Sequence, residues 1–308
     1  MNVVVVGLGI QGNKRFAIAG QEVVATVDPV NPNARYKAVE DVPLSSFDAA
    51  LVCTPDRVKL DLLGYLLGNG KHVLVEKPLL VEDEAQLGHL QNISRRTGAV
   101  CYTAYNHRFE PHIVRLKEIL ESGGLGTIYL ARFFYGNGTA RDVQLSAWRD
   151  TDLGVLPDLG SHMLDMALFL FGDTVGPFEP WSVNRFENRS FDHVMFGSTS
   201  MPVLEMEATL LSWRNTFTVD VFGESGTAHI HGLCKWGPST FTVRTRVLPS
   251  GKPDQETHTL ECTDPTWAAE YKYFKALCQS GGTNLENDQW IHSALHGLAE
   301  KMGVGLAA

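Results

Sequence analysis

A glycine-rich turn stands near the start of the chain, where Gly7, Gly9 and Gly12 follow an apolar run at 2–6. This spacing allows a tight turn, the approach of a pyrophosphate to the backbone, and close packing of a helix whose N-terminus carries positive potential. Asp28 ends the next apolar run, 21 residues after Gly7. Its carboxylate could bind the 2′-hydroxyl of NAD, and it would repel the 2′-phosphate of NADP by about 4 kcal/mol at a separation of about 4 Å. The pattern predicts an NAD site. NADP is less favoured but stays open because Arg35 is near, and a turn without any ligand is the alternative.

A second group of residues ends the fourth apolar run, where Glu76, Lys77 and Pro78 follow residues 72–75. Ligands of open α/β sheets bind at the carboxyl edge of the strands, so Lys77 is expected to point into the cleft that holds the nicotinamide. A lysine there could stabilise the alkoxide that precedes hydride loss. A surface Glu-Lys pair at the end of a strand is an equally good interpretation.

The third group has helical spacing. Asp158, His162 and Asp165 stand at i, i+4 and i+7, which places them on one face of a helix. A histidine that titrates near neutral pH, held by a carboxylate one turn away, could act as general base in alcohol oxidation. Two alternatives stay open from the spacing. Asp158 could be only the N-cap of the helix, and the three side chains could hold a metal, although we predict no metal among the site residues.

The elements that must position these residues change in character along the chain. In the first hundred residues, β-branched runs alternate with segments of helical period, which is typical of βαβ units. The expected strands are 2–6, 22–28, 48–54, 72–76 and 99–103, and the expected helices are 11–19, 57–67 and 82–97. Because residues 29–47 contain Pro29, Pro32 and Pro43, this connection has room for about two helical turns at most.

Beyond a helix at 111–121, strands separated by turns replace this alternation. The expected strands are 126–136, 181–186, 193–198, 203–212, 216–223, 227–232 and 240–248, with a hairpin tip at 249–253 and helices at 158–171, 267–279 and 289–301. We therefore predict an α/β protein of two domains. Residues 1–122 form a Rossmann domain, which is a doubly wound parallel sheet, and residues 123–308 form an α+β domain built on an antiparallel sheet.

Composition excludes several classes of protein. The chain has 308 residues, with 26 Lys and Arg against 35 Asp and Glu, and the net charge of −9 disfavours nucleic acid and membrane lipid as partners. With 44% hydrophobic residues it is neither disordered nor a coiled coil, and no run of about 18 apolar residues predicts a membrane helix. Five cysteines without a Cys-x-x-Cys pair indicate free thiols in a reducing compartment. We expect a cytoplasmic protein with a small-molecule ligand.

Six motifs in register resemble those of one enzyme family. They are Gly7-x-Gly9-x-x-Gly12, Thr54-Pro55, Gly70-Lys71-His72-Val73 with Glu76-Lys77-Pro78, Tyr105-Asn106-x-Arg108-Phe109, Trp148-Arg149, and Asp158-x-Gly160-x-His162-x-x-Asp165. Over nearly the whole chain they resemble the Gfo/Idh/MocA oxidoreductases. The resemblance implies a Rossmann domain that binds a nicotinamide dinucleotide. It also implies a C-terminal domain whose large open antiparallel sheet covers the cleft and joins the chains of a homodimer or homotetramer.

The resemblance also implies roles for individual residues. Lys77, Asp158 and His162 would be catalytic, with His162 as base, Asp158 orienting it and Lys77 polarising the hydroxyl. The residues expected at the cofactor are Gly7, Gly9, Ile10, Gln11, Gly12, Asp28, Thr54, Pro55, Glu76, Lys77, Trp148 and Arg149. Those expected at the substrate are Tyr105, Asn106, Arg108, Asp158 and His162. A cis peptide bond is expected before Pro78.

Three features depart from the family pattern. Lys59 stands where relatives often have the histidine of Thr-Pro-Asn-x-x-His, Gly154 alone remains of a glycine-rich run before Asp158, and the connection 29–47 is short. The three proposed catalytic residues are nevertheless all present. The leading hypothesis is an NAD-dependent dehydrogenase of a secondary hydroxyl on a sugar, nucleotide-sugar or cyclitol. The alternatives are a keto-sugar reductase that uses NADH or NADPH, and a dinucleotide-binding regulatory protein without turnover.

Overall fold

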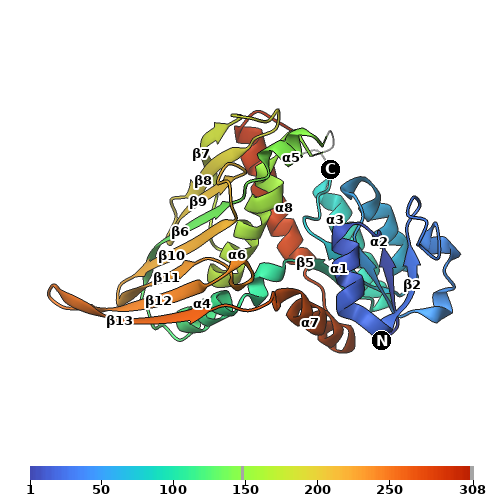
Figure 1. Cartoon of the computed structure of the whole chain (residues 1–308), viewed down its shortest axis with the longest axis horizontal. Helices are drawn as coiled ribbons and strands as arrows, with labels where there is room; N and C mark the ends of the chain where they lie inside the picture. Colours follow the sequence, from blue (N-terminus) through green and yellow to red (C-terminus); the bar gives the residue numbers. More distant parts are fainter. Residues whose placement is uncertain (147–148, 306–308) are drawn as a thin grey trace. The chain divides into compact units, whose positions relative to one another are not determined.

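The computed structural model describes residues 1–146 and 149–305, and these residues form two compact units (Figure 1). The first unit consists of Met1–Asn106 and Trp267–His292. The second consists of His107–Thr266 and, within the described residues, 293–305. The segment Trp267–His292, although near the end of the sequence, therefore belongs by its contacts to the unit that contains the glycine-rich turn.

The first unit contains a parallel sheet of five strands in the order β2-β1-β3-β4-β5. These strands are β1 (Val3–Val6), β2 (Val23–Val27), β3 (Ala49–Val52), β4 (His72–Glu76) and β5 (Cys101–Ala104). The helices of this unit are α1 (Ile10–Ala19), α2 (Lys59–Gly68), α3 (Glu84–Thr97) and α7 (Thr266–Ser280). The predicted parallel sheet of the N-terminal half is thereby confirmed.

Helices cover both faces of this sheet, which is why its strands are apolar without alternation. On one face Val4 packs with Leu63 of α2 in a core that also includes α3. On the other face Val5 packs with Tyr271 and Phe274 of α7. Successive side chains of β1 thus enter opposite layers, as the pleat of a strand requires.

The connection after β2 contains only two 3-10 turns, Val39–Asp41 and Leu44–Ser46. The prediction of at most two helical turns is confirmed. Beyond β2, Tyr36 forms a single parallel bridge with Val27. If Tyr36 is counted as a one-residue strand, the sheet has the 3-2-1-4-5-6 order of a Rossmann fold, and its switch point lies between β1 and β3.

The second unit contains an eight-stranded sheet in the order β13-β12-β11-β10-β6-β9-β8-β7. The strands are β6 (Ile128–Gly136), β7 (Glu179–Asn184), β8 (His193–Ser198), β9 (Val203–Thr209), β10 (Thr216–Gly223), β11 (Gly226–His231), β12 (Ser239–Val247) and β13 (Gly251–Leu260). The large antiparallel sheet is confirmed, with one exception, since β6 and β9 pair in parallel. The hairpin near 249–253 is present, but β13 was not among the predicted strands.

Helices α4 (Pro111–Glu121) and α6 (Ser161–Phe171) pack against this sheet. Phe171 of α6 lies edge-on to Phe133 of β6, with ring centroids 6.5 Å apart, and His112 of α4 stacks on Phe241 of β12 at 5.7 Å. A π-helical turn, Leu156–Gly160, leads directly into α6. The remaining helices are the short α5 (Ala140–Gln144) and α8 (Leu285–Lys301), whose residues are divided between the two units.

Candidate active site

The glycine-rich turn joins β1 to α1 in very close packing. Gly7 has a φ of +89°, and a Cβ there would lie 2.5 Å from the carbonyl oxygen of Cys53. A Cβ on Gly12 would lie 1.8 Å from the carbonyl oxygen of Gly7, whereas one on Gly9 would meet nothing within 4 Å. Only glycine fits at the first and third positions, and the second faces open space, as the approach of a pyrophosphate requires.

The N-terminus of α1 has no side-chain cap. Gly9 is its N-cap, and its first turn contains no acidic residue. Backbone N–H groups left in this way form a ready site for phosphate. Ile10 and Gln11 are exposed at this end, with Ile10 79% exposed. Asn13, which sequence reasoning missed, donates from Nδ2 to the carbonyl oxygens of Leu8 and Gly9, at 3.0 Å each, and so holds the turn.

Asp28 is bound to the same turn. Its Oδ2 accepts the Leu8 N–H at 2.8 Å, and its Oδ1 accepts the N–H groups of Val30 and Asn31 at 2.9 and 2.8 Å. Burial favours the protonated acid, but these hydrogen bonds and the charge of Lys37 together hold the pKa of Asp28 below its usual range. The carboxylate is therefore ionised at neutral pH and lies beside the glycine-rich turn.

The two cations near Asp28 in sequence both donate to backbone carbonyl groups. Lys37 donates to the carbonyl oxygen of Asn31 at 2.9 Å. Arg35 donates from Nη1 to the carbonyl oxygen of Val24 at 3.3 Å, and its guanidinium lies 5.4 Å from the centroid of the Tyr36 ring. Arg35, the residue that kept NADP open in the sequence, is exposed and lies at the edge of β2.

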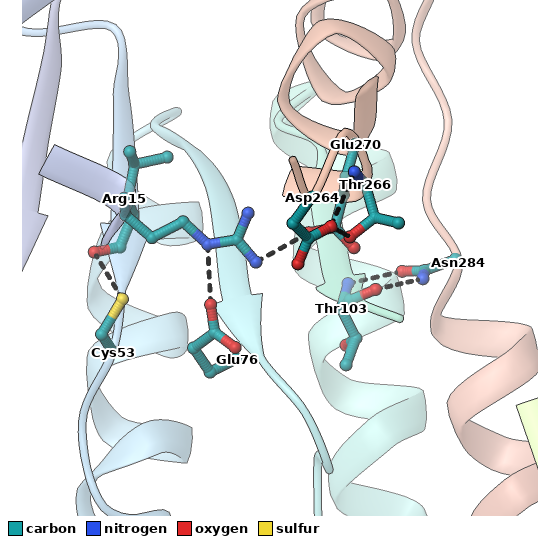
Figure 2. Close-up of polar contacts among 9 residues, drawn as sticks. Arg15, Cys53, Glu76, Thr103, Asp264, Thr266, Glu270 and Asn284 are labelled. Atoms are coloured by element: carbon teal, nitrogen blue, oxygen red, sulfur yellow. Dashed lines mark hydrogen bonds and ion pairs between the residues drawn. The ribbon is translucent and has the colours of Figure 1, made fainter. Parts of the chain in front are cut away.

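Glu76, at the end of β4, belongs to a buried ionic network that the sequence did not predict. The Arg15 side chain of α1 lies between two carboxylates (Figure 2). Its Nε bonds Glu76 at 2.7 Å, and its Nη2 bonds Glu270 of α7 at 2.7 Å. Burial alone would lower the pKa of Arg15, but the charges of Glu270 and Glu76 raise it above its usual value. The arginine is permanently charged and connects three elements of the first unit.

Thr54, Pro55 and Lys77 lie at the carboxyl end of the same sheet. The buried Thr54 hydroxyl oxygen has no hydrogen-bond partner among the described residues. Pro55 is exposed at the start of a 3-10 turn, Asp56–Val58, and Lys77 is partly exposed directly after β4. The expected cis peptide bond joins Lys77 to Pro78. The uncapped end of α1, the space beside Gly9 and the unpaired Thr54 hydroxyl together fit a bound dinucleotide.

Lys59, the residue that departs from the family pattern, is buried at the start of α2. Its ammonium donates to the carbonyl oxygens of Glu76 and Pro78 at 2.7 and 2.8 Å, and it forms an ion pair with Asp56 at 2.6 Å. Tyr105 and Asn106, two of the expected substrate residues, are buried at the end of β5. Sequence reasoning noted Lys59 only as a replacement for histidine and gave it no role.

In the second unit, the expected substrate residue Arg108 is paired with α6. Its Nε lies 2.8 and 2.7 Å from the two carboxylate oxygens of Asp165, and its Nη2 lies 2.7 Å from one of them. Burial raises the pKa of Asp165, and Arg108 opposes that rise. Asp165 shares the predicted helix with His162, but its contact is this arginine.

His162 is buried among aromatic rings in the second unit. Its ring meets that of His107 edge-on, with centroids 4.0 Å apart, and lies 6.0 Å from the ring of Tyr135 on β6. Burial raises the pKa of Tyr135. The ring of Tyr135 is also close to that of Trp236, with centroids 5.9 Å apart. Sequence reasoning missed His107, although it occupies the unassigned position of Tyr105-Asn106-x-Arg108.

Asp158 is half-exposed and lies in the π-helical turn rather than in a regular helix. Such turns are rare and often occur at functional sites. Its carboxylate is 3.6 Å from Nη2 of Arg149, another expected site residue. Trp148, the neighbour of Arg149 in the predicted cofactor set, lies outside the described residues. The structure thus brings Asp158 close to Arg149, and His162 close to His107.

Two further findings concern other classes of site. Within residues 1–146 and 149–305, no three His, Cys, Asp or Glu side chains are grouped so that they could hold a metal ion. The Asp-His-Asp metal site that the spacing left open is therefore not formed by these described side chains. None of the helices in the described part of the chain is both long and apolar enough to cross a membrane.

Two family models match the chain in order. Residues 1–105 match the model described as an oxidoreductase family with an NAD-binding Rossmann fold, and residues 113–229 match the GFO/IDH/MocA C-terminal domain. Together they cover most of the sequence; the first contains all five strands of the parallel sheet, and the second contains β6 to β10 and the start of β11. Lys77 and Asp28 fall within the first match, and Asp158 and His162 within the second.

Comparison with individual proteins gives low identities. The chain is 28% identical over 139 residues to an inositol 2-dehydrogenase of Rhizobium meliloti, covering 45% of this chain and 39% of that one. With inositol 2-dehydrogenase 3 of Saccharopolyspora erythraea, the identity is 23% over 276 residues, covering 82% and 80%. In three curated alignments the chain spans 35% to 39% of the relative's length. The solved structure of a levoglucosan dehydrogenase in complex with NADH superposes with a TM-score of 0.83 at 17% identity, covering 100% and 99%.

Proposed function

The chain belongs to the Gfo/Idh/MocA family of oxidoreductases, and from this premise we propose that it is an NAD-dependent dehydrogenase acting on a secondary hydroxyl of a sugar, nucleotide-sugar or cyclitol. The observation that carries the cofactor assignment is the ionised Asp28, bound to the glycine-rich turn by the Leu8 N–H. The inositol dehydrogenases among the relatives support the substrate class.

The proposed roles follow the chemistry of each side chain. When bound, NAD supplies the nicotinamide that accepts a hydride. Lys77 donates a hydrogen bond to the reacting oxygen and stabilises its negative charge. His162 takes the hydroxyl proton, and Asp158 helps to hold the substrate and orient the base. The remaining predicted cofactor and substrate residues, including Thr54, Pro55, Arg149, Tyr105 and Asn106, stay in the proposal as contacts.

Arg108 is the one substrate residue whose proposed role the structure redirects. Because its guanidinium already makes a bidentate pair with Asp165, we propose that it fixes η5 (Asn106–Phe109) against α6 and contacts the substrate only secondarily. The pair has two parallel contacts, from Nε and Nη2, and is mostly buried, so this edge of the guanidinium is occupied by Asp165.

The decisive experiment is turnover on panels of free sugars, cyclitols, sugar phosphates and nucleotide-sugars, with NADH absorbance as readout. We expect one class to be oxidised with NAD. The Lys77→Ala variant should bind NAD as the parent does but lose most turnover, whereas Lys71→Ala, at the opposite end of β4, should be active. Turnover only of keto compounds with NADH would favour the reductase, and NAD binding without turnover in either direction would favour a regulatory protein.

Two wider parts of the proposal concern assembly and location. We propose a homodimer or homotetramer joined through the eight-stranded sheet, supported by the exposed Trp181 and Val183 on β7. The assembly can be tested by light scattering after size exclusion. A measured mass equal to that of a single chain would contradict the proposal. A reducing, cytoplasmic location is supported by the five cysteines, all of which are free thiols.

A further inference from the structure

Lys59 has an environment that is unusual for a lysine. It is the first residue of α2, and only 3% of its surface is exposed. Lysine is almost never fully buried unless it is paired, and a cation at a helix N-terminus opposes the helix dipole. Neither the stability of α2 nor the hydrophobic core therefore explains a lysine at this position. The polar contacts of the Lys59 ammonium account for it.

The three N–H donors of the Lys59 ammonium match three acceptors. They are the carbonyl oxygens of Glu76 and Pro78 and the carboxylate of Asp56. The two carbonyl groups belong to the residues directly before and directly after Lys77. The backbone on both sides of Lys77 is thus bound to one buried ammonium at the start of α2.

From this geometry we infer that Lys59 is a positioning residue, which sets the place of the Lys77 ammonium by fixing the backbone that carries it. The inference rests on the proposed catalytic role of Lys77. Hydrogen bonds from a charged donor are roughly twice as strong as neutral ones, and two of them on alternate residues restrain both translation and rotation of the residue between. A displacement of about 1 Å at a catalytic group can reduce the rate about 100-fold.

The test compares Lys59→Met with a matched lysine variant on the same strand. Lys71 lies just before β4, at its opposite end, and donates to the carbonyl oxygen of Phe47 at 2.9 Å. Lys71→Met therefore also removes a lysine-to-carbonyl bond, but one far from Lys77 along the strand. For each variant we would measure kcat and KM, the NAD dissociation constant, and hydrogen exchange of the Lys77 and Leu79 amides.

We expect Lys59→Met to lower kcat by about 10-fold to 100-fold while NAD affinity stays within about 3-fold. Exchange of the two amides should rise by at least about 10-fold, because two charge-assisted bonds are lost. Lys59→Arg can still donate to both carbonyl groups and should recover part of kcat. Lys71→Met should resemble the parent protein in all of these measurements.

Unchanged exchange in Lys59→Met would overturn the inference, and so would an unchanged kcat or a loss of NAD affinity equal to the loss of kcat. If the parent protein turns over no substrate, the proposed function fails while the exchange measurement still decides whether Lys59 holds Lys77. If Lys59→Arg is as impaired as Lys59→Met although both fold, the carbonyl bonds are not what matters, and the inference is wrong.

Discussion

The buried arginine of α1 is the residue whose loss should destabilise the first unit most. Arg15 is 1% exposed and bonds Glu76 and Glu270 at 2.7 Å each, and the Glu270 side chain is 0% exposed. The variant Arg15→Met keeps an unbranched apolar side chain but removes the guanidinium and its charge. It leaves two carboxylates facing a methyl group where a guanidinium stood.

The expected magnitude follows from the buried carboxylate. Removing one partner of a buried ion pair costs about 3–5 kcal/mol, because the other charge stays desolvated and uncompensated. Glu270 should supply most of this, since Glu76 is 14% exposed and partly solvated. With a denaturant slope of about 3 kcal/mol per molar urea, the midpoint of unfolding should fall by at least about 1 M.

The deficit should also depend on pH with a defined sign. Without its cation, the buried Glu270 carboxylate takes up a proton more readily in the folded variant than in the unfolded chain. Because Glu270 takes up its proton at a higher pH in the folded variant than in the unfolded chain, lowering the pH stabilises the folded variant. The difference between parent and variant should therefore be largest near pH 7.5 and shrink toward pH 5.

Urea unfolding followed by circular dichroism measures both effects. Lys14→Met is the matched control, because Lys14 is the exposed neighbour of Arg15 and lies over the same Trp267 ring, 5.0 Å from its centroid. It should cost less than about 1 kcal/mol. The double variant Arg15→Met with Glu270→Gln should be more stable than Arg15→Met alone. A cost below about 1 kcal/mol, a deficit independent of pH, or additivity in the double variant would refute the reasoning.

Three further predictions concern the two halves of the site. Asp28→Ser should shift the ratio of NADP to NAD affinity at least about 100-fold toward NADP. Binding titrations that give the same ratio of dissociation constants in parent and variant would contradict this. His162→Asn should lower kcat by about 100-fold to 10,000-fold with NAD affinity unchanged, so a loss of only 3-fold or less would remove His162 as the base. Gly12→Ala should abolish NAD binding, because its Cβ would stand 1.8 Å from the Gly7 carbonyl oxygen, whereas Gly64→Ala, which meets nothing within 4 Å, should bind NAD normally.

Most of the first sheet could be predicted from sequence because strands such as β1 and β3 are continuous apolar runs buried on both faces. Strand β13 could not, since residues 251–257 are all exposed and show no alternation of apolar and polar side chains. The parallel pairing of β6 with β9 was also out of reach. A period of two identifies a strand but carries no information about which strand lies beside it.

The limits of prediction at the site have a similar cause. The glycines and Lys77 stand in motifs whose spacing reflects local geometry, so the sequence alone makes them candidates. The contact of Arg15 with Glu270 joins positions 255 residues apart, and no local pattern encodes it. One signal was present: Gly12, Arg15 and Ala19 are the buried residues of α1 and follow helical spacing, so an arginine on that face had to be paired.

Arg15 and Lys59 act on the same short segment from opposite sides of the sheet. α1 contributes to the apolar layer that contains Val3 and Val5, and α2 to the layer that contains Val4. Arg15 binds the side chain of Glu76, while Lys59 binds the carbonyl groups of Glu76 and Pro78. Because both cations are buried and paired, neither has to move when a ligand arrives, and the segment that carries Lys77 is fixed in advance. Such preorganisation suits the role proposed for Lys77, because a charge that is already in place costs no reorganisation when a negative charge develops beside it.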